Sequence, residues 1–285
     1  MIEQSKVFHS SGTISSIGKR IPCGEFKQIH SIFDRNINFL YNDLIVSLSN
    51  IKSYEGVLRL VIPNLELHKI KAIEHYPGKI IINGNEIFNY IEENIYDPFL
   101  PQMYLRSNSI SSDLTDLKAK YLAKDKQYTL AYLLNKDNVP IPERSSYDSE
   151  FMKQMNRAFR ALKDGNYPLA VQGFKGRGYG LTPSGDDFLI GYLIGLSFRE
   201  YLGDRAVTDL KQEIYRLALG SNPLVNTFLF EAVNGYCNSY WKSFLTKLIR
   251  GTGDVVVDFE AILSEGETSG YDMMAGFLTC FEIEI

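Results

Sequence analysis

Residues 173–195 read GFKGRGYGLTPSGDDFLIGYLIG, which is the most distinctive stretch of the sequence. Closely spaced glycines precede a Thr-Pro-Ser-Gly-Asp-Asp block, which runs directly into an apolar segment. A Ser followed by acidic residues ahead of an apolar run is typical of the start of a helix. Such a start does not need the flexible glycines, because each of them loses extra backbone entropy on folding. The stretch therefore predicts a helix start and leaves open whether it also holds a ligand.

The same pattern occurs a second time near the C-terminus. Residues 184–193, SGDDFLIGYL, align with residues 269–278, SGYDMMAGFL, and a Thr precedes each copy at 182 and 268. Both copies read S-G-x-D-x-x-x-G-aromatic-Leu, which we interpret as a duplicated helix start. Each Ser would be the N-cap, and Asp187 or Asp272 would be the third helical residue of a capping box with Asp in place of Glu or Gln.

Two such helix starts that meet across a pseudo-two-fold axis would line one cleft. Free amides at a helix N-terminus attract anions, and glycines let a ligand approach them closely. We expect these amides and the hydroxyls to hold a small anion or amide, while Asp187 and Asp272 act as the catalytic pair. The two carboxylates would orient an amide or coordinate Mg²⁺, the one cofactor that the residues suggest. The residues predicted to bind the ligand are Arg177, Gly178, Gly180, Thr182, Ser184, Gly185, Asp186, Thr268, Ser269 and Gly270.

The composition excludes several classes of protein. Apolar residues make up 45% of the chain and charged residues 22%, as in a globular protein, and the net charge of −4 gives no basic field for nucleic acid. The longest apolar run is far shorter than the about 20 residues that span a bilayer. The glycine run matches neither a Rossmann nor a P-loop motif. Without an apolar leader or a CxxC pair, the sequence predicts a cytoplasmic protein with reduced, buried thiols.

The histidines are all confined to the first 75 residues, at His9, His30, His68 and His75. A Ser-His-Asp triad or a His-ligated zinc site built wholly within the glycine-rich half is therefore excluded. His30 lies beside Ser31 in a β-rich segment, where a strand histidine is the more common role. We include His30 among the candidate binding residues for the case in which the two halves of the chain meet.

The pattern of apolar residues changes along the chain. Up to about residue 90, short apolar runs alternate with turn signals, which predicts strands in a meander, a sandwich or a small barrel. Two prolines in the segment DPFLP, residues 97–101, suggest a boundary. The remainder predicts helices at about 112–134, 150–164, 184–202, 206–219, 223–234, 239–250 and 270–281. We therefore expect an α+β protein, with a β-rich domain over 1–100 and an all-α domain over 101–285.

Residues 176–191, GRGYGLTPSGDDFLIG, resemble the G-x-G-x-G-L-T-P-S-G-D-D-F-L-x-G signature of the AllH-like family. This is a domain of unknown function found in the AllH subunit of oxamate carbamoyltransferase. Residues 29–33, 226–235 and 268–272 also resemble the family, so the likeness spans nearly the whole chain. It implies a multi-component system in which a carbamoyl group is exchanged between oxalurate and phosphate, and partners that are the other subunits of that system.

Two hypotheses about function remain open at this point. In the first, the chain is a carbamoyltransferase subunit that binds a small carboxylate, carbamoyl or phosphate compound at the paired helix starts. No residue there is an evident activated nucleophile, which favours direct transfer between bound substrates or chemistry completed by a partner. In the second, the chain is a non-catalytic structural or regulatory subunit, and its motif is only a double helix cap. The first predicts an open cleft with unpaired amides, and the second predicts a closed site.

Overall fold

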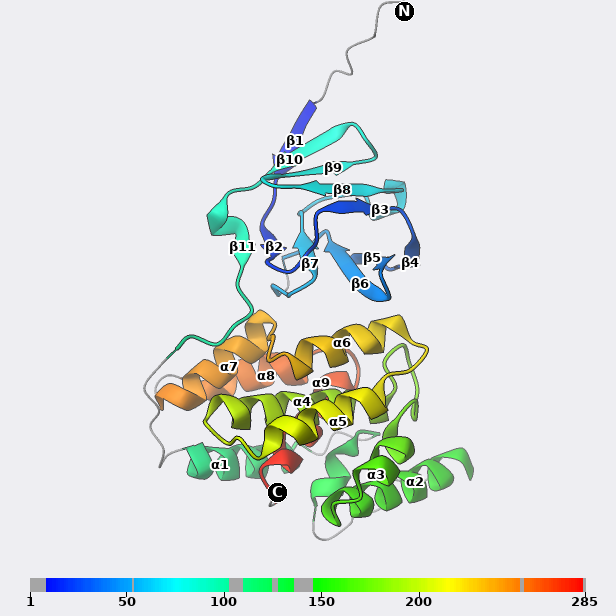
Figure 1. Cartoon of the computed structure of the whole chain (residues 1–285), viewed down its shortest axis with the longest axis vertical. Helices are drawn as coiled ribbons and strands as arrows, with labels where there is room; N and C mark the ends of the chain where they lie inside the picture. The colour runs from blue at the N-terminus through cyan, green and yellow to red at the C-terminus, as the bar shows by residue number, and fades with distance from the viewer. Residues whose placement is uncertain are drawn as a thin grey trace, which may run out of the picture. The chain divides into compact units, whose positions relative to one another are not determined.

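The computed structural model describes residues 9–52, 54–102, 110–124, 128–135, 146–251 and 254–283. The chain divides into two compact units. The first unit comprises Met1–Phe99 together with Cys237–Ser239, and the second comprises Leu100–Tyr236 and Tyr240–Ile285. Strands are found in the first unit and α-helices in the second, so the predicted α+β class is confirmed (Figure 1).

The first unit is built from two sheets in its described part. One sheet has the strand order β1-β10-β9-β8-β3, and the other has the order β11-β2-β7-β6-β5-β4. The strands are β1 His9–Thr13, β2 Ser16–Gly18, β3 Gly24–Phe26, β4 Ile29–Ile32, β5 Asn36–Tyr41, β6 Leu44–Ser49, β7 Arg59–Val61, β8 Ile73–Tyr76, β9 Lys79–Ile82, β10 Glu86–Asn89 and β11 Ile95–Tyr96. Because β1–β10, β11–β2 and β6–β7 are parallel pairs, the unit is not the simple meander that the sequence also allowed.

The tight turns of this unit lie where the sequence places its turn signals. Asn42 and Asp43, between β5 and β6, both have positive φ, at 46° and 64°. This conformation suits Asn, Asp and Gly, and its twist matches that of the flanking strands. Between β9 and β10, Asn83 and Gly84 repeat the arrangement with φ of 53° and 73°.

The second unit is helical, and its helices surround one apolar helix. In its described part the helices are α1 Ile110–Leu122, α2 Ser146–Lys163, α3 Tyr167–Phe174, α4 Ser184–Tyr201, α5 Val207–Ala218, α6 Pro223–Val233, α7 Ser239–Arg250, α8 Val255–Leu263 and α9 Ser269–Cys280, with a 3₁₀ turn, η3, at Leu130–Leu134. Every residue of α4 from 184 to 198 is buried. This helix packs against α5, α6 and α9, which places the predicted motif in the core of the unit (Figure 1).

One predicted helix is shorter in the structure, and two observed helices were not predicted. The helix expected over 112–134 ends at Leu122, since Tyr128 has a φ of 62° and Thr129 is extended before the 3₁₀ turn η3. The short helices α3 and α8 were not predicted. The run Val255-Val256-Val257 opens α8, and β-branched residues have low helix propensity, so tertiary packing decides this segment.

Two further observations concern expectations drawn from composition. Cys237 and Cys280 are buried free thiols, as expected, whereas the free thiol of Cys23 is exposed, because it lies in the surface turn before β3. No helix in the described ranges is long and apolar enough to cross a membrane.

Candidate functional site

The two predicted helix starts are the first turns of α4 and α9, but their serines are not N-caps. Pro183 occupies the N-cap position of α4 and Thr268 that of α9, and neither gives a side-chain capping hydrogen bond. The Asp187 amide donates to the Pro183 carbonyl, and the Asp272 amide donates to the Thr268 carbonyl, each at 3.0 Å. The predicted capping boxes are therefore wrong. Each Ser is the first helical residue, and its hydroxyl faces the other helix.

The glycine of each motif brings the two helices into backbone contact. A Cβ on Gly191 of α4 would lie 1.8 Å from the carbonyl oxygen of Met273 in α9. A Cβ on Gly276 of α9 would lie 2.0 Å from the carbonyl oxygen of Phe188 in α4. Because both distances are far below van der Waals contact, only glycine fits at either position. The contacts are reciprocal, since Phe188 and Met273 hold equivalent places in the two copies of the pattern.

The aspartates and hydroxyls of the two motifs face each other in the same reciprocal way. Ser269 lies beside Asp187, and Ser184 lies beside Asp272. The Thr182 hydroxyl donates to Asp187 Oδ2 at 3.2 Å and lies 3.2 Å from the Ser269 hydroxyl. We call Thr182, Ser184, Asp187, Thr268, Ser269 and Asp272 the paired helix starts. Their carboxyls are closed off inside the unit, since Asp187 is 1% exposed and Asp272 is 0% exposed, while the side chains of Thr182 and Ser269 are half-buried.

Asp272 is also held by a segment far away in the sequence. The Leu130 amide, at the start of η3, donates to Asp272 Oδ1 at 2.6 Å. Asp272 Oδ2 is buried and accepts no hydrogen bond of normal geometry in the described part of the chain, although the Ser184 and Thr268 hydroxyls lie close to the carboxyl. The sequence does not indicate this contact, because every residue except proline has a backbone amide and Leu130 lies 142 positions away from Asp272.

Both carboxyls are shifted toward their protonated forms. Burial raises the pKa of Asp272 to about 7, against the opposing effects of the Leu130 amide and the Ser184 and Thr268 hydroxyls. Burial also raises the pKa of Asp187 well above its usual value, and the charge of Asp272 raises it further. Two buried carboxyls that repel each other lose their protons in separate steps. The pair therefore retains its last proton to a higher pH than exposed carboxyls do.

The glycine-rich loop before α4 is fixed by the second acid of the motif. The Gly176 amide donates to Asp186 Oδ1 at 2.9 Å, and the Gly185 amide donates to the Arg177 carbonyl at 2.8 Å. Gly178 has a φ of 119°, and a Cβ there would lie 2.6 Å from the Ser184 nitrogen. Asp186 thus shapes the loop. Burial raises its pKa, while the Gly176 amide and the charge of Lys175 lower it.

Several backbone amides of this loop remain unused. Within the described residues, the amides of Gly178, Gly180 and Thr182 donate no hydrogen bond to the protein. By contrast, Gly185 and Gly270 are both engaged. Their amides donate to the Arg177 and Glu265 carbonyls, and a Cβ on either would lie 2.0 Å from a carbonyl of the preceding helix.

The basic residues beside the loop have different roles. Lys175 Nζ donates to the carbonyls of Leu217 and Leu219, at and just beyond the C-terminus of α5, so its charge serves that helix end. Arg177 is exposed. His30 is exposed on β4 of the first unit, with its Nδ1 3.1 Å from the Ser31 hydroxyl, and its role in ligand binding stays a prediction.

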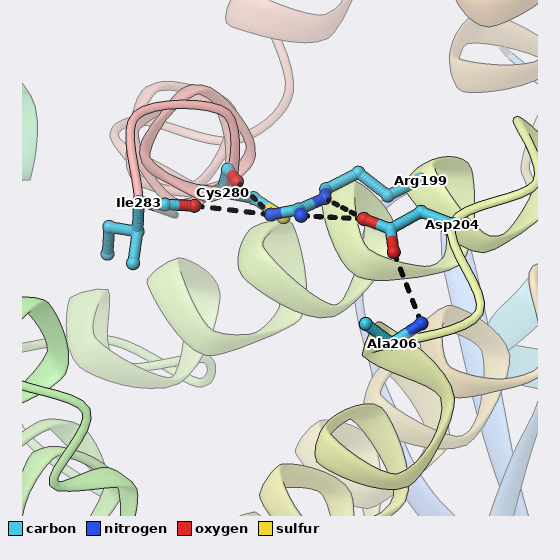
Figure 2. Close-up of polar contacts among 5 residues, drawn as sticks. All are labelled: Arg199, Asp204, Ala206, Cys280 and Ile283. Carbon is cyan, nitrogen blue, oxygen red and sulfur yellow. Dashed lines mark hydrogen bonds and ion pairs between the residues drawn. The ribbon is translucent and has the colours of Figure 1, made fainter. Parts of the chain in front are cut away.

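Arg199 is a half-buried cation that the sequence pattern did not indicate. It lies near the end of α4 and joins that end to the end of α9 (Figure 2). Its guanidinium donates to Asp204 Oδ2 at 2.9 and 2.6 Å, and to the Cys280 and Ile283 carbonyls at 3.1 and 3.3 Å. Arg199 thus ties together the C-terminal ends of the two helices whose N-terminal ends form the paired helix starts.

The Mg²⁺ interpretation stays a prediction, because Mg²⁺ binds proteins through as few as one or two carboxylates. Across the described ranges of the chain, no group of three or more His, Cys, Asp or Glu side chains is arranged to hold a metal ion. The two helix N-termini also direct their positive ends toward the site, which favours anions over cations.

The fold and the site define an α+β protein in which two helix starts pack reciprocally around buried aspartates, next to a glycine-rich loop. The model of the family described as oxamate carbamoyltransferase subunit AllH matches residues 174–281, which contain both helix starts. The predicted resemblance to the AllH-like family is thus confirmed over this part of the helical unit. Neither the curated proteins nor the solved structures contain a match.

Proposed function

We propose that the chain is a subunit of an oxamate carbamoyltransferase-like system. The support for this is the family match, which runs from the end of α3 to the end of α9 and includes the glycine-rich loop. We further propose that the helical unit binds a small carboxylate, carbamoyl or phosphate compound at the paired helix starts, which derive from a duplicated helix start.

The observation that carries the binding proposal is the cluster of unused donors beside half-buried hydroxyls. The amides of Gly178, Gly180 and Thr182 donate to nothing within the described residues, and the hydroxyl of Thr182 lies 3.2 Å from that of Ser269. Amides with this freedom at a helix N-terminus bind anionic oxygens. In a transfer reaction, these donors and the serine hydroxyls would stabilise developing negative charge, while Asp187 and Asp272 would position the amide end of the substrate.

A second candidate function rests on the burial of the carboxyls. Asp187 and Asp272 are at most 1% exposed and already face hydroxyls of the protein. In this alternative the motif is a structural contact between α4 and α9 that admits no ligand, and the chain is a structural or regulatory subunit.

Thermal unfolding of the purified chain separates the two functions. The ligands are carbamoyl phosphate, oxamate, oxalurate and phosphate, each with and without Mg²⁺. A ligand at about 100 times its dissociation constant stabilises the folded state by about 2.7 kcal/mol. We expect a shift of this size with at least one ligand in the wild type, and a smaller shift in Asp187→Asn and Asp272→Asn.

The matched control is Asp209→Asn, an exposed aspartate in the first turn of α5. This variant should keep the full ligand-induced shift. If none of the four ligands moves the wild-type transition, the binding proposal fails and the structural alternative stands.

A further inference from the structure

The carboxyl pair at the paired helix starts cannot move apart without separating α4 from α9. Gly191 and Gly276 hold the two backbones in direct contact, with no space for even one added carbon atom. Arg199 fastens the opposite ends of the same helices. A new negative charge near the carboxyls therefore acts on them without a separation of the helices, and it favours their protonated forms.

The titratable groups around this pair are acids, which are either negative or neutral. The titratable groups that interact with it are Asp186 on α4, Tyr121 on α1 and Tyr132 on η3. Tyr121 donates its hydroxyl to the Tyr271 carbonyl and Tyr132 donates its own to the Met152 carbonyl, so neither phenol neutralises a carboxylate. In the described part of the chain, no basic side chain forms an ion pair with Asp187 or Asp272. Negative charge on Asp187 and Asp272 can therefore be neutralised by a bound proton.

Asp272 Oδ2 is the place where such a proton would fit. This oxygen is fully buried and accepts no hydrogen bond in the described structure, whereas Oδ1 of the same group is occupied by the Leu130 amide. An unprotonated, unpartnered carboxylate oxygen in a buried position is costly. Protonation turns it into a donor, and the oxygens of Ser184 and Thr268 lie close enough to accept.

An anion at the loop would add negative charge close to the pair. The Thr182 hydroxyl contacts both Asp187 Oδ2 and the Ser269 hydroxyl, and the side chains of Thr182 and Ser269 are half-buried. An anion bound to these hydroxyls would therefore lie one hydroxyl group away from the Asp187 carboxyl. In surroundings of low dielectric constant, a charge at this range acts strongly on a carboxylate. We propose that an anion binds to the paired helix starts together with a proton, which Asp187 and Asp272 hold between them. This inference rests on the proposed function and adds its regulation by pH.

The sign of the effect follows from linkage. A bound anion raises the pKa of both carboxyls, so the complex holds more protons than the free protein. Binding therefore weakens as pH rises. Because burial already brings the pKa of Asp272 to about 7, the change falls around neutral pH.

Isothermal titration calorimetry with oxamate tests this inference. Oxamate keeps one negative charge over the pH range used, so protons that are taken up belong to the protein. At pH 7, titrations in two buffers of different ionisation enthalpy give the number of protons bound with the ligand. We expect an uptake of at least a third of a proton per site and a fall in affinity of about tenfold from pH 6 to pH 8.

The variants show where the proton goes. Asp272→Asn keeps an oxygen for the Leu130 amide and a donor in place of the proton, and it should reduce both the proton uptake and the pH dependence. Asp187→Asn should do the same if Asp272→Asn fails to fold. Asp209→Asn should bind as the wild type does.

Two results would overturn the inference. The first refutes the proton linkage alone, and the second also refutes the proposed anion site. Oxamate binding with no proton uptake and equal affinity at pH 6 and pH 8 would refute the proton linkage and leave the anion site standing. No heat and no thermal shift with oxamate, phosphate, oxalurate or carbamoyl phosphate at any pH would refute the anion site and the linkage with it.

Discussion

At the scale of single residues, the partner of each motif side chain belongs to the other copy of the motif. Ser184 lies beside Asp272 and Ser269 beside Asp187, whereas the sequence pattern predicts that each Ser and Asp serve the same helix end. The physical reason is the closeness of α4 and α9. Once the helices touch at their glycines, the first-turn side chains point into a shared interior, and burial without partners would be more costly than the loss of two caps.

The raised pKa of Asp272 predicts a pH-dependent stability. A carboxyl whose folded pKa lies above its unfolded value stabilises the fold below the unfolded pKa, and this contribution is lost as pH rises through the folded pKa of about 7. We expect the free energy of unfolding of the wild type to fall between pH 5 and pH 8, by at most about 1.4 kcal/mol per pH unit for this group. Asp272→Asn should flatten that dependence.

Urea unfolding followed by Trp241 fluorescence measures this effect in the helical unit, because Trp241 is the single tryptophan of the chain and is buried in α7. Asp209→Asn is the control and should keep the wild-type slope. Parallel pH profiles for the wild type and Asp272→Asn would contradict the prediction.

At the scale of elements, the contact between α4 and α9 depends on two glycines. Gly276→Ala places a methyl group 2.0 Å from the Phe188 carbonyl, and no side-chain rotation relieves a clash with backbone. We expect the helical unit to lose about 3 kcal/mol or more of unfolding free energy, despite the better helix propensity of Ala. The control is Gly220→Ala, whose added carbon meets only the flexible end of Lys175. Equal stability of the two variants would show that α4 and α9 can move apart.

Arg199 makes a second connection between the same two helices. Arg199→Met keeps much of the buried stem but leaves the Asp204 carboxylate and the carbonyls near the end of α9 without their donor (Figure 2). We expect a loss of about 2–4 kcal/mol in the urea unfolding of the helical unit. Arg205→Met changes an exposed arginine nearby and should cost less than about 0.5 kcal/mol. A small effect at Arg199 would mean that its contacts are replaced by water.

At the scale of the whole molecule, the first unit is not continuous in sequence. It takes in Cys237–Ser239, the segment between α6 and α7. The Tyr96 hydroxyl donates to the Cys237 carbonyl at 2.9 Å, and the Glu55 amide donates to the Ser239 hydroxyl at 3.0 Å. The chain therefore folds back to complete this unit long after its first 99 residues.

These contacts predict that Tyr96→Phe loosens the segment without unfolding the chain. The buried Cys237 carbonyl loses a donor, which typically costs about 1 kcal/mol. Hydrogen–deuterium exchange should show faster exchange for peptides that cover 237–239 and 95–99. The control, Tyr76→Phe, removes an exposed hydroxyl that donates to Glu74 Oε2, and it should leave both peptides unchanged. Unaltered exchange in Tyr96→Phe would show that the segment is held by other contacts.

The sequence by itself determined the α+β class, the position of the turns at Asn42 and Asn83, and the span of α4, predicted as 184–202 and observed as Ser184–Tyr201. These features depend on local periodicity and on residues with unusual backbone freedom, which a single sequence displays. The tertiary structure alone decided that the serines face the opposite carboxyls, that Leu130 holds Asp272, and that α8 is a helix despite its three valines. These outcomes depend on contacts between positions far apart in the chain. Their energies exceed the local preferences that the sequence pattern reports.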